Sequence, residues 1–183
     1  MLQQKHVRLI APCFMIVLLF FTLLFSGCTQ SNKTQTTGED FPFTTLTGET
    51  THLHNYYGNV IVLDLMAVNC QPCMMEMLAL HQIYQNYTSK NVTVLSIDVW
   101  VMSGETSALL QQYLNEFRVQ INLSLDWTFG LDDTRGTIEQ KYASEGVPTL
   151  YVLDTKGNIY YSHVGYEDYA TLSSTLDEIL GNI

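Results

Sequence analysis

The sequence predicts an α/β domain, with a central mixed β-sheet flanked by helices on both faces and a β-hairpin at its N-terminal side. Apolar runs typical of buried strands alternate with stretches of helical periodicity along residues 41–183. The resulting order is βαβα followed by ββα, and these roughly 140 residues suffice for one hydrophobic core. No internal repeat is present in the sequence. We therefore expect one folded domain over residues 41–183.

Each element follows from a local pattern of side chains. A strand is expected where apolar and polar residues alternate or where a short run is apolar throughout, and a helix where apolar residues recur three or four positions apart. Turn residues at Gly48-Glu49 and Lys156-Gly157 predict two hairpins. The predicted elements are strands at 43–47, 51–53, 60–66, 92–97, 149–153 and 159–164, and helices around 77–87, 109–117, 137–143 and 172–180.

An apolar segment, residues 9–25, follows two basic residues near the N-terminus. Such a segment is a signal peptide or a membrane anchor. Its 17 residues are at the lower limit for a bilayer-spanning helix, for which about 20 is usual, so both alternatives stay open. The stretch Phe25-Ser26-Gly27-Cys28 resembles a lipobox, which makes Cys28 the expected site of lipid attachment. Residues 1–28 are thus a signal peptide, a lipoprotein signal or an anchor, and the polar residues 29–40 a flexible tether.

The distribution of charge bears on location and partners. Positive charge precedes the apolar segment and none follows it until Lys33, which places the folded domain outside the cytoplasm, tethered to the cell membrane. Without Lys5 and Arg8 the chain carries 6 basic and 18 acidic residues, a net charge of −12. This acidity argues against nucleic acid as a partner and against electrostatic adhesion to anionic lipid. Membrane attachment then depends on the N-terminal segment or its lipid.

Two cysteines, Cys70 and Cys73, lie where the predicted strand 60–66 gives way to a helix. The other cysteines, Cys13 and Cys28, belong to the N-terminal segment, so the domain holds only this pair. A disulfide across so short a loop constrains the unfolded chain little, which favours a redox role over a stapling one. A helix N-terminus stabilises a thiolate. We expect Cys70 to attack a disulfide and Cys73, in a first turn that suits Pro72, to resolve the mixed disulfide.

Three segments resemble, in order, the TlpA/ResA-like branch of the thioredoxin superfamily, a group of membrane-tethered extracytoplasmic thiol-disulfide oxidoreductases. They are the leading hairpin at residues 40–60, the stretch Ala67-Val68-Asn69-Cys70-Gln71-Pro72-Cys73, and Glu145-Gly146-Val147-Pro148-Thr149 with the turn that follows. The resemblance implies a thioredoxin-like fold, a redox-active disulfide that needs no dissociable cofactor, and disulfide-containing substrate proteins, including apocytochrome c. It also implies a membrane-embedded thiol electron donor. Asn69 departs from the tryptophan usual in this branch.

The resemblance implies roles for further residues. Asp64 matches the buried acid of thioredoxins, and Glu76 matches a glutamate that this branch often carries one turn after the second cysteine. A carboxyl group in apolar surroundings has a raised pKa and can exchange the proton of the buried sulfur. The Val147-Pro148 bond is implied to be cis and to face the cysteines, presenting backbone groups to an extended substrate. Gln71-Pro72 is expected to border the same substrate site.

Two other functions are compatible with this fold. A thiol peroxidase of the redoxin group would use a Thr-x-x-Cys arrangement, and Ala67 stands in the threonine position. A copper-binding metallochaperone would use both thiols as ligands, but such relatives carry Cys-x-x-x-Cys with a distal histidine, for which His163 is the candidate. The other histidines of the domain show no second ligand pair at zinc-site spacing, so no metal site is predicted; they are His52, His54 and His81.

Overall fold

The computed structural model describes residues 36–182. Its strands are β1 (Thr36–Thr37), β2 (Pro42–Thr45), β3 (Thr50–His52), β4 (Val60–Met66), β5 (Val92–Asp98), β6 (Thr128–Leu131), β7 (Thr149–Leu153) and β8 (Asn158–Val164). Its α-helices are α2 (Gln71–Tyr87), α3 (Ser107–Ile121), α4 (Thr137–Tyr142) and α5 (Tyr169–Gly181). Short 3₁₀ helices are η2 (Leu53–Tyr56), η3 (Thr88–Lys90) and η4 (Trp100–Ser103).

The eight strands form one mixed sheet in the order β1-β8-β7-β4-β5-β6-β2-β3. The central strand β4 pairs in parallel with β5 and antiparallel with β7. All seven residues of β4 are buried, as its apolar composition predicted. This is a thioredoxin-like fold with an added N-terminal hairpin, β2–β3, and it confirms the predicted fold class.

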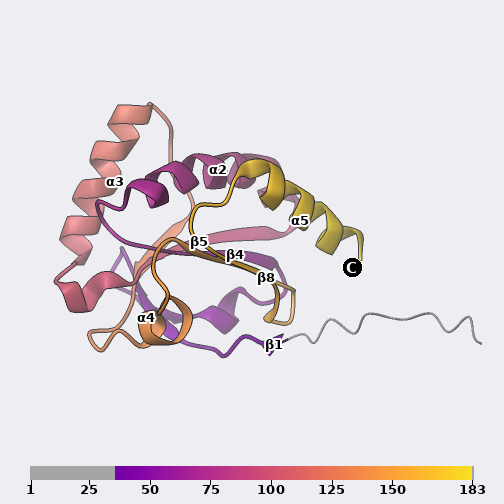
Figure 1. Cartoon of the computed structure of the whole chain (residues 1–183), viewed down its shortest axis with the longest axis horizontal. Helices are drawn as coiled ribbons and strands as arrows, with labels where there is room; N and C mark the ends of the chain where they lie inside the picture. Colours follow the sequence, from indigo (N-terminus) through magenta and orange to yellow (C-terminus); the bar gives the residue numbers. More distant parts are fainter. Residues whose placement is uncertain (1–35, 183) are drawn as a thin grey trace, which may run out of the picture. The chain divides into compact units, whose positions relative to one another are not determined.

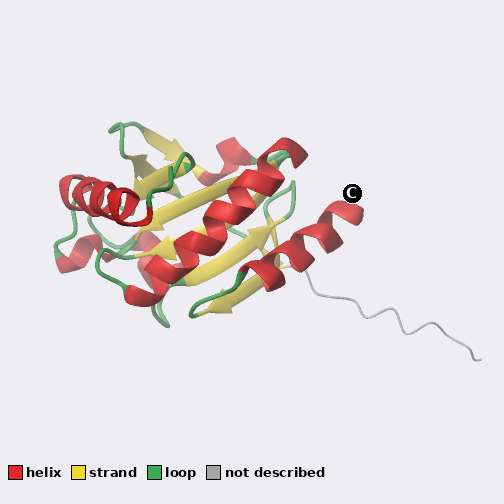
Figure 2. Ribbon diagram, turned by 90° about the horizontal axis from the view of Figure 1, so that it is seen from above, coloured by secondary structure: helices red, strands yellow, loops and turns green. Residues whose placement is uncertain are grey.

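Helices cover both faces of the sheet, with α2 and α5 on one side and α4 on the other (Figure 1). Alternate side chains of β4 pack into two separate hydrophobic cores, one on each face of the sheet. Val62 packs in the core that includes α2, α3 and α5, and Leu63 packs in the core that includes α4 and η2. Figure 2 shows α2 crossing the sheet with α5 beside it. A hydrogen bond from the Tyr87 hydroxyl to Asp177 Oδ1, at 2.9 Å, joins these two helices.

The N-terminal boundary of the domain differs from the expected one. Residues 36–40, which composition assigned to the tether, are part of the folded unit: β1 pairs with β8, and the Gly38 N–H donates to the Gly157 carbonyl at 3.1 Å. The expected signal or anchor, Cys28 and the tether up to residue 35 lie outside the described residues. Within residues 36–182, no helix is long and apolar enough to span a membrane.

Candidate functional site

Cys70 and Cys73 form a disulfide at the N-terminal end of α2. Asn69, just before it, has φ 59°, a left-handed conformation that asparagine adopts more readily than most residues. Cys70 is the N-cap of the helix, and its Sγ accepts a hydrogen bond from the Cys73 N–H at 3.2 Å. Cys70 is 9% exposed and Cys73 1%. The first sulfur is therefore the more accessible of the two, as the sequence predicted.

The loop before β7 faces this disulfide. Its Val147–Pro148 peptide bond is cis, which confirms the expectation. The Val147 carbonyl oxygen lies 3.9 Å from Cys70 Sγ. Gln71 and Pro72 are exposed at the start of α2. Of the residues expected to meet a substrate, the structure thus brings the cis peptide against the disulfide and leaves Gln71 and Pro72 facing solvent.

Two buried carboxyl groups lie on the sheet-facing side of α2. Glu76 shares the buried face of the helix with Cys73, one turn earlier. Its Oε1 accepts a hydrogen bond from the Glu167 N–H at 3.2 Å, and its Oε2 has no hydrogen-bond partner among the described residues. Asp64 Oδ2 accepts a hydrogen bond from the Ser96 hydroxyl at 2.7 Å. The sequence-predicted acids are therefore both present as buried groups next to the sulfur-bearing helix.

Burial raises the pKa of both acids. Burial, and secondarily the charge of Asp64, raises the pKa of Glu76 to about 9. Burial also raises the pKa of Asp64 to about 7, against the lowering effect of the Ser96 hydrogen bond. The two groups interact, so they titrate as a pair. At neutral pH this pair retains at least one proton beside the disulfide.

Glu167, which the sequence did not indicate as a site residue, lies next to Glu76. It follows β8, and besides the backbone bond to Glu76 its side chain accepts a hydrogen bond from the Tyr161 hydroxyl. His163 Nδ1 lies 3.9 Å from Glu167 Oε2. Glu167 itself is nearly buried, whereas His163 is exposed. A chain of polar groups thus leads from Glu76 toward the surface.

A second acidic pair lies on the other side of the cysteine loop. Glu105 Oε2 accepts a hydrogen bond from the Val68 N–H at 2.9 Å, two residues before Cys70. Burial, followed by the hydrogen bond with Glu105, raises the pKa of Asp98 to about 8. Asp98 ends β5 in register with Met66, the last residue of β4. Because the carboxyl ends of parallel strands meet at one edge, this register was a signal for Asp98, whereas Glu105 lies in a loop that carries none.

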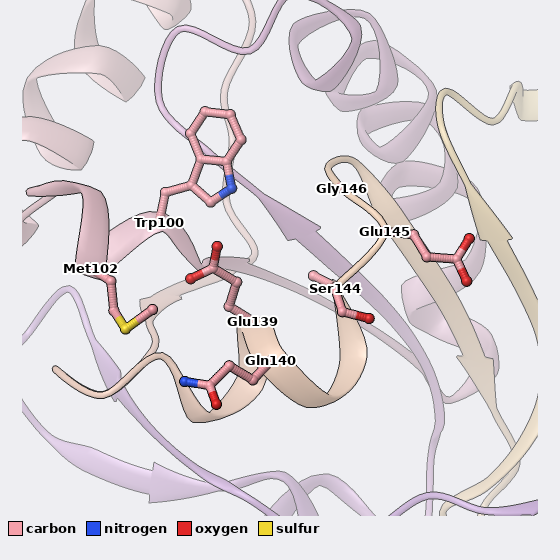
Figure 3. A pocket seen from close by; sticks show the side chains of 8 residues that line it. Trp100, Met102, Glu139, Gln140, Ser144, Glu145 and Gly146 are labelled. Atoms are coloured by element: carbon pink, nitrogen blue, oxygen red, sulfur yellow. The ribbon is translucent and has the colours of Figure 1, made fainter.

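A cavity of about 580 Å³ adjoins the cis-peptide loop (Figure 3). Its lining residues are Trp100, Met102, Glu139, Gln140, Ala143, Ser144, Glu145 and Gly146. In Figure 3 the Glu139 carboxyl points into the space between Trp100 and Met102, and Glu145 points away from it. Gly146 directly precedes Val147, whose carbonyl faces Cys70. The cavity is therefore continuous in sequence with the loop at the disulfide, and it combines apolar walls with an acidic rim.

Comparisons with known proteins agree with this geometry. Residues 35–162 match the model of the AhpC/TSA family. The chain is 27% identical to the thioredoxin-like protein YneN of Bacillus subtilis over 138 residues, 75% of each chain. It is 23% identical to the thiol-disulfide oxidoreductase ResA of Bacillus thuringiensis subsp. konkukian over 161 residues, 87% of each chain.

A solved structure with the same arrangement is a putative thiol:disulfide interchange protein DsbE from Chlorobium tepidum. It has a TM-score of 0.65 and 25% identity, covering 80% of this chain and 97% of its own.

Ala67 is buried beside the disulfide loop and supplies no hydroxyl of the kind that a Thr-x-x-Cys arrangement offers. The chain therefore belongs to the AhpC/TSA family, as a thiol-disulfide oxidoreductase with a thioredoxin-like fold.

Proposed function

We propose that this protein reduces or exchanges disulfides in partner proteins outside the cytoplasm, with Cys70 as the attacking sulfur and Cys73 as the resolving one. The observation that carries the proposal is the Cys70–Cys73 disulfide at a helix N-terminus, with the first sulfur the more exposed and a proton-holding carboxyl pair behind the second. Helix N-termini stabilise anions, so a reduced Cys70 would be a reactive thiolate there.

The reaction needs only the two sulfurs and the substrate disulfide. The Cys70 thiolate attacks one substrate sulfur, a Cys70–substrate disulfide forms, and the other substrate sulfur leaves as a thiolate. Cys73 then gives up its proton and attacks Cys70 Sγ, which releases the second substrate thiolate. Two electrons pass from the cysteine pair to the substrate, and the pair ends as the disulfide seen here. Every step is reversible, so the same chemistry runs as oxidation or exchange.

The buried acids are proposed to accept the proton of the Cys73 thiol and to return it. When Cys73 becomes part of the disulfide its proton must leave an apolar site, and Glu76 lies one helical turn away on the same buried face. The raised pKa values of Glu76 and Asp64 mean that the pair keeps such a proton at neutral pH. In the reverse direction Glu76 returns the proton to the leaving Cys73 thiolate. Glu167 and Tyr161 are proposed to hold the Glu76 carboxyl in place.

The substrate segment is proposed to extend along the cis-peptide loop into the adjoining cavity. Backbone groups of Val147 would pair with it in the manner of an added strand. The cavity offers apolar contact from Trp100 and Met102 and negative charge from Glu139. The favoured substrates are therefore protein disulfides flanked by an apolar and a basic side chain. The resemblance noted above suggests apocytochrome c as one such protein.

Replacing Trp100 by alanine is expected to weaken substrate binding without slowing the chemistry. Trp100 is partly exposed in the cavity wall, and the Trp100 N–H, which donates to Asp98 Oδ1 at 3.0 Å, is kept in the variant. Loss of an aromatic contact of this kind costs about 1 kcal/mol, which is roughly a fivefold to tenfold rise in KM. KM and kcat are measured with a disulfide peptide that carries a leucine and a lysine next to its cysteine. Leu109→Ala, another exposed apolar residue outside the cavity, is the control, and an unchanged KM for the tryptophan variant would exclude this substrate path.

The proposal also assigns the protein a place at the membrane. Residues 1–28 would hold it there as an uncleaved anchor, or Cys28 would do so through a lipid. A reductase consumes one pair of electrons per turnover, so a membrane-embedded thiol donor must restore the dithiol. Whether the protein works as reductant or oxidant depends on the potential of its cysteine pair.

A redox titration tests the proposed activity as a whole. After equilibration with mixtures of reduced and oxidised glutathione or dithiothreitol, the fraction of free Cys70 and Cys73 is expected to follow a two-electron curve. Its midpoint should lie within the range of known exchange proteins, about −270 mV for a reductant to about −120 mV for an oxidant. A disulfide that stays closed across this range would show that the pair is structural.

A further inference from the structure

A cluster of three ligand-type side chains lies where residues 36–40 meet the N-terminal hairpin. Asp40 precedes β2, His52 ends β3, and His54 lies in η2. One ligand atom of each residue lies within 4.8 Å of those of the other two. None of these residues contributes to the disulfide site or to the cavity beside it. We propose that Asp40, His52 and His54 form a binding site for a divalent transition-metal ion, with Zn²⁺ as the reference ion.

The distances suit a small ion. His52 Nδ1 and His54 Nδ1 lie 2.9 and 2.8 Å from Asp40 Oδ2. Ligand atoms around a tetrahedral Zn²⁺ ion, with bonds of about 2.0 to 2.1 Å, are about 3.3 Å apart. Each Nδ1–Oδ2 distance therefore differs by only about half an ångström from the separation that a bound ion requires. Both imidazoles are about half exposed, so water can occupy the fourth position.

The chemistry of the three groups also suits a cation. Both imidazoles direct Nδ1 at the same carboxylate oxygen, so without an ion each must carry a proton on Nδ1 to donate a hydrogen bond. When one divalent ion binds to both Nδ1 atoms, each neutral imidazole carries its proton on Nε2 instead, and all three ligand atoms are satisfied at once. Two histidines and one carboxylate form a donor set used by zinc and by other first-row divalent ions. The acidic net charge of the domain attracts cations to its surface.

The carboxylate of Asp40 is oriented in advance by a backbone hydrogen bond. Asp40 Oδ1 accepts a hydrogen bond from the His54 backbone N–H at 2.8 Å, which turns Oδ2 toward the two rings. A hydrogen bond of this kind to the second oxygen is the usual way in which proteins orient a metal ligand. The backbone hydrogen bond leaves Oδ2 free to face both imidazoles, as a bridging or terminal metal ligand must.

Binding of an ion here has a structural consequence. Asp40 belongs to the segment that leads from β1 to β2, whereas both histidines belong to the hairpin side of the contact. An ion held by all three would cross-link the incoming chain to β3 and η2. Since the ligands come together only in the folded protein, the ion would also raise the melting temperature, by an amount that grows with the logarithm of its concentration relative to its Kd.

Isothermal titration with Zn²⁺ tests the site. The full-length protein is used without a histidine tag and in its disulfide form, so that Cys70 and Cys73 cannot act as ligands. We expect one ion per chain from this site, and we expect His52→Ala and His54→Ala each to weaken binding by about tenfold or more. Asp40→Asn keeps the shape of the side chain but removes its charge, and it should weaken binding as well. The melting temperature should rise with Zn²⁺ in the parent protein and not in the double histidine variant.

His163→Ala is the matched control, because His163 is exposed and also lies near a carboxylate, that of Glu167, but belongs to no ligand cluster among residues 36–182. Its Zn²⁺ affinity is expected to equal that of the parent. Equal affinities in the parent and in His52→Ala, His54→Ala and Asp40→Asn would overturn the proposal, as would the absence of any Zn²⁺-dependent rise in melting temperature. The proposed redox activity does not depend on either outcome.

Discussion

Replacing Cys70 by serine is expected to abolish turnover of protein disulfides, whereas replacing Cys73 by serine is expected to stop the reaction halfway. Cys70 is the more exposed sulfur and sits at the N-cap of α2, so without it no thiolate can attack the substrate. Without Cys73 the attack still occurs, but the Cys70–substrate disulfide has no resolving thiol. The measurement is the rate of reduction of a fluorescent disulfide peptide by each variant after pre-reduction.

Both variants should lose steady-state turnover to the detection limit, since neither can complete the cycle. They should differ in a single turnover: the Cys73→Ser protein releases one equivalent of substrate thiol in a burst and then stops, and the Cys70→Ser protein releases none. Substitution of both cysteines is the baseline. A burst of equal size from the two single variants would mean that either sulfur can attack, which would contradict the roles assigned from their exposure.

Replacing Glu76 by glutamine is expected to slow reduction of the Cys70–Cys73 disulfide by about a hundredfold at pH 7, with the deficit disappearing at alkaline pH. Glu76 is protonated below its pKa of about 9, which burial raises, so at pH 7 it can supply the proton that the leaving Cys73 thiolate needs. Glutamine supplies none at any pH. Above about pH 9 the parent has lost this proton too, and the two rates should converge.

The measurement is the rate of reduction by dithiothreitol from pH 6 to 10, expressed as the ratio of parent to variant so that the ionisation of the reagent cancels. Asp64→Asn provides a second readout. The Asp64 charge contributes to the raised pKa of Glu76, so its removal should move the point of convergence to lower pH. Glu116→Gln, an exposed acid on α3, is the control. A ratio that does not vary with pH would mean that Glu76 serves only to support the fold.

Most of the fold was predictable because its elements carry strong local signals. The strand β4 was predicted with its observed bounds, since a run that is buried on both faces is apolar throughout. The strand β6 was not predicted, because its four residues include Gly130 and its strand character depends on its neighbours. A Cβ atom at Gly130 would lie 2.6 Å from a ring carbon of Phe43, so glycine is needed there for β2 to pair alongside. Such a requirement is invisible in a single sequence.

In the candidate site, too, some residues carry a local signal in the sequence and others are identified only by long-range contacts. Cys70 and Cys73 were indicated by their position where an apolar strand gives way to a helix, whereas Glu76 and Asp64 were implied by the resemblance to the TlpA/ResA-like proteins and to thioredoxins. Glu167, which contacts Glu76 through its backbone, is 91 residues away in sequence and carries no local signal. Long-range contacts of this kind are set by the packing of β8 and α5 against the central strands.

The histidine cluster shows that a rule based on ligand spacing in the sequence misses ligands that come from separate segments. The histidines show no zinc-site pattern of paired ligands in the sequence, yet the structure brings His52 and His54 together with Asp40. The two histidines are only two residues apart, which was the available signal, but their common approach to Asp40 depends on the turn from β3 into η2. Asp40 was not considered as a metal ligand, because the polar composition of residues 29–40 assigned it to a flexible tether.

The two sulfurs have different roles in the proposed reaction, and peptide mapping of a trapped adduct tests this difference most directly. Reduced Cys73→Ser protein is mixed with a disulfide peptide, quenched with acid, digested and analysed by mass spectrometry. We expect the peptide to be attached through Cys70 in essentially every adduct, and the reduced Cys70→Ser protein to form none. An adduct on Cys73 in the Cys70→Ser protein, formed at a comparable rate, would contradict this expectation.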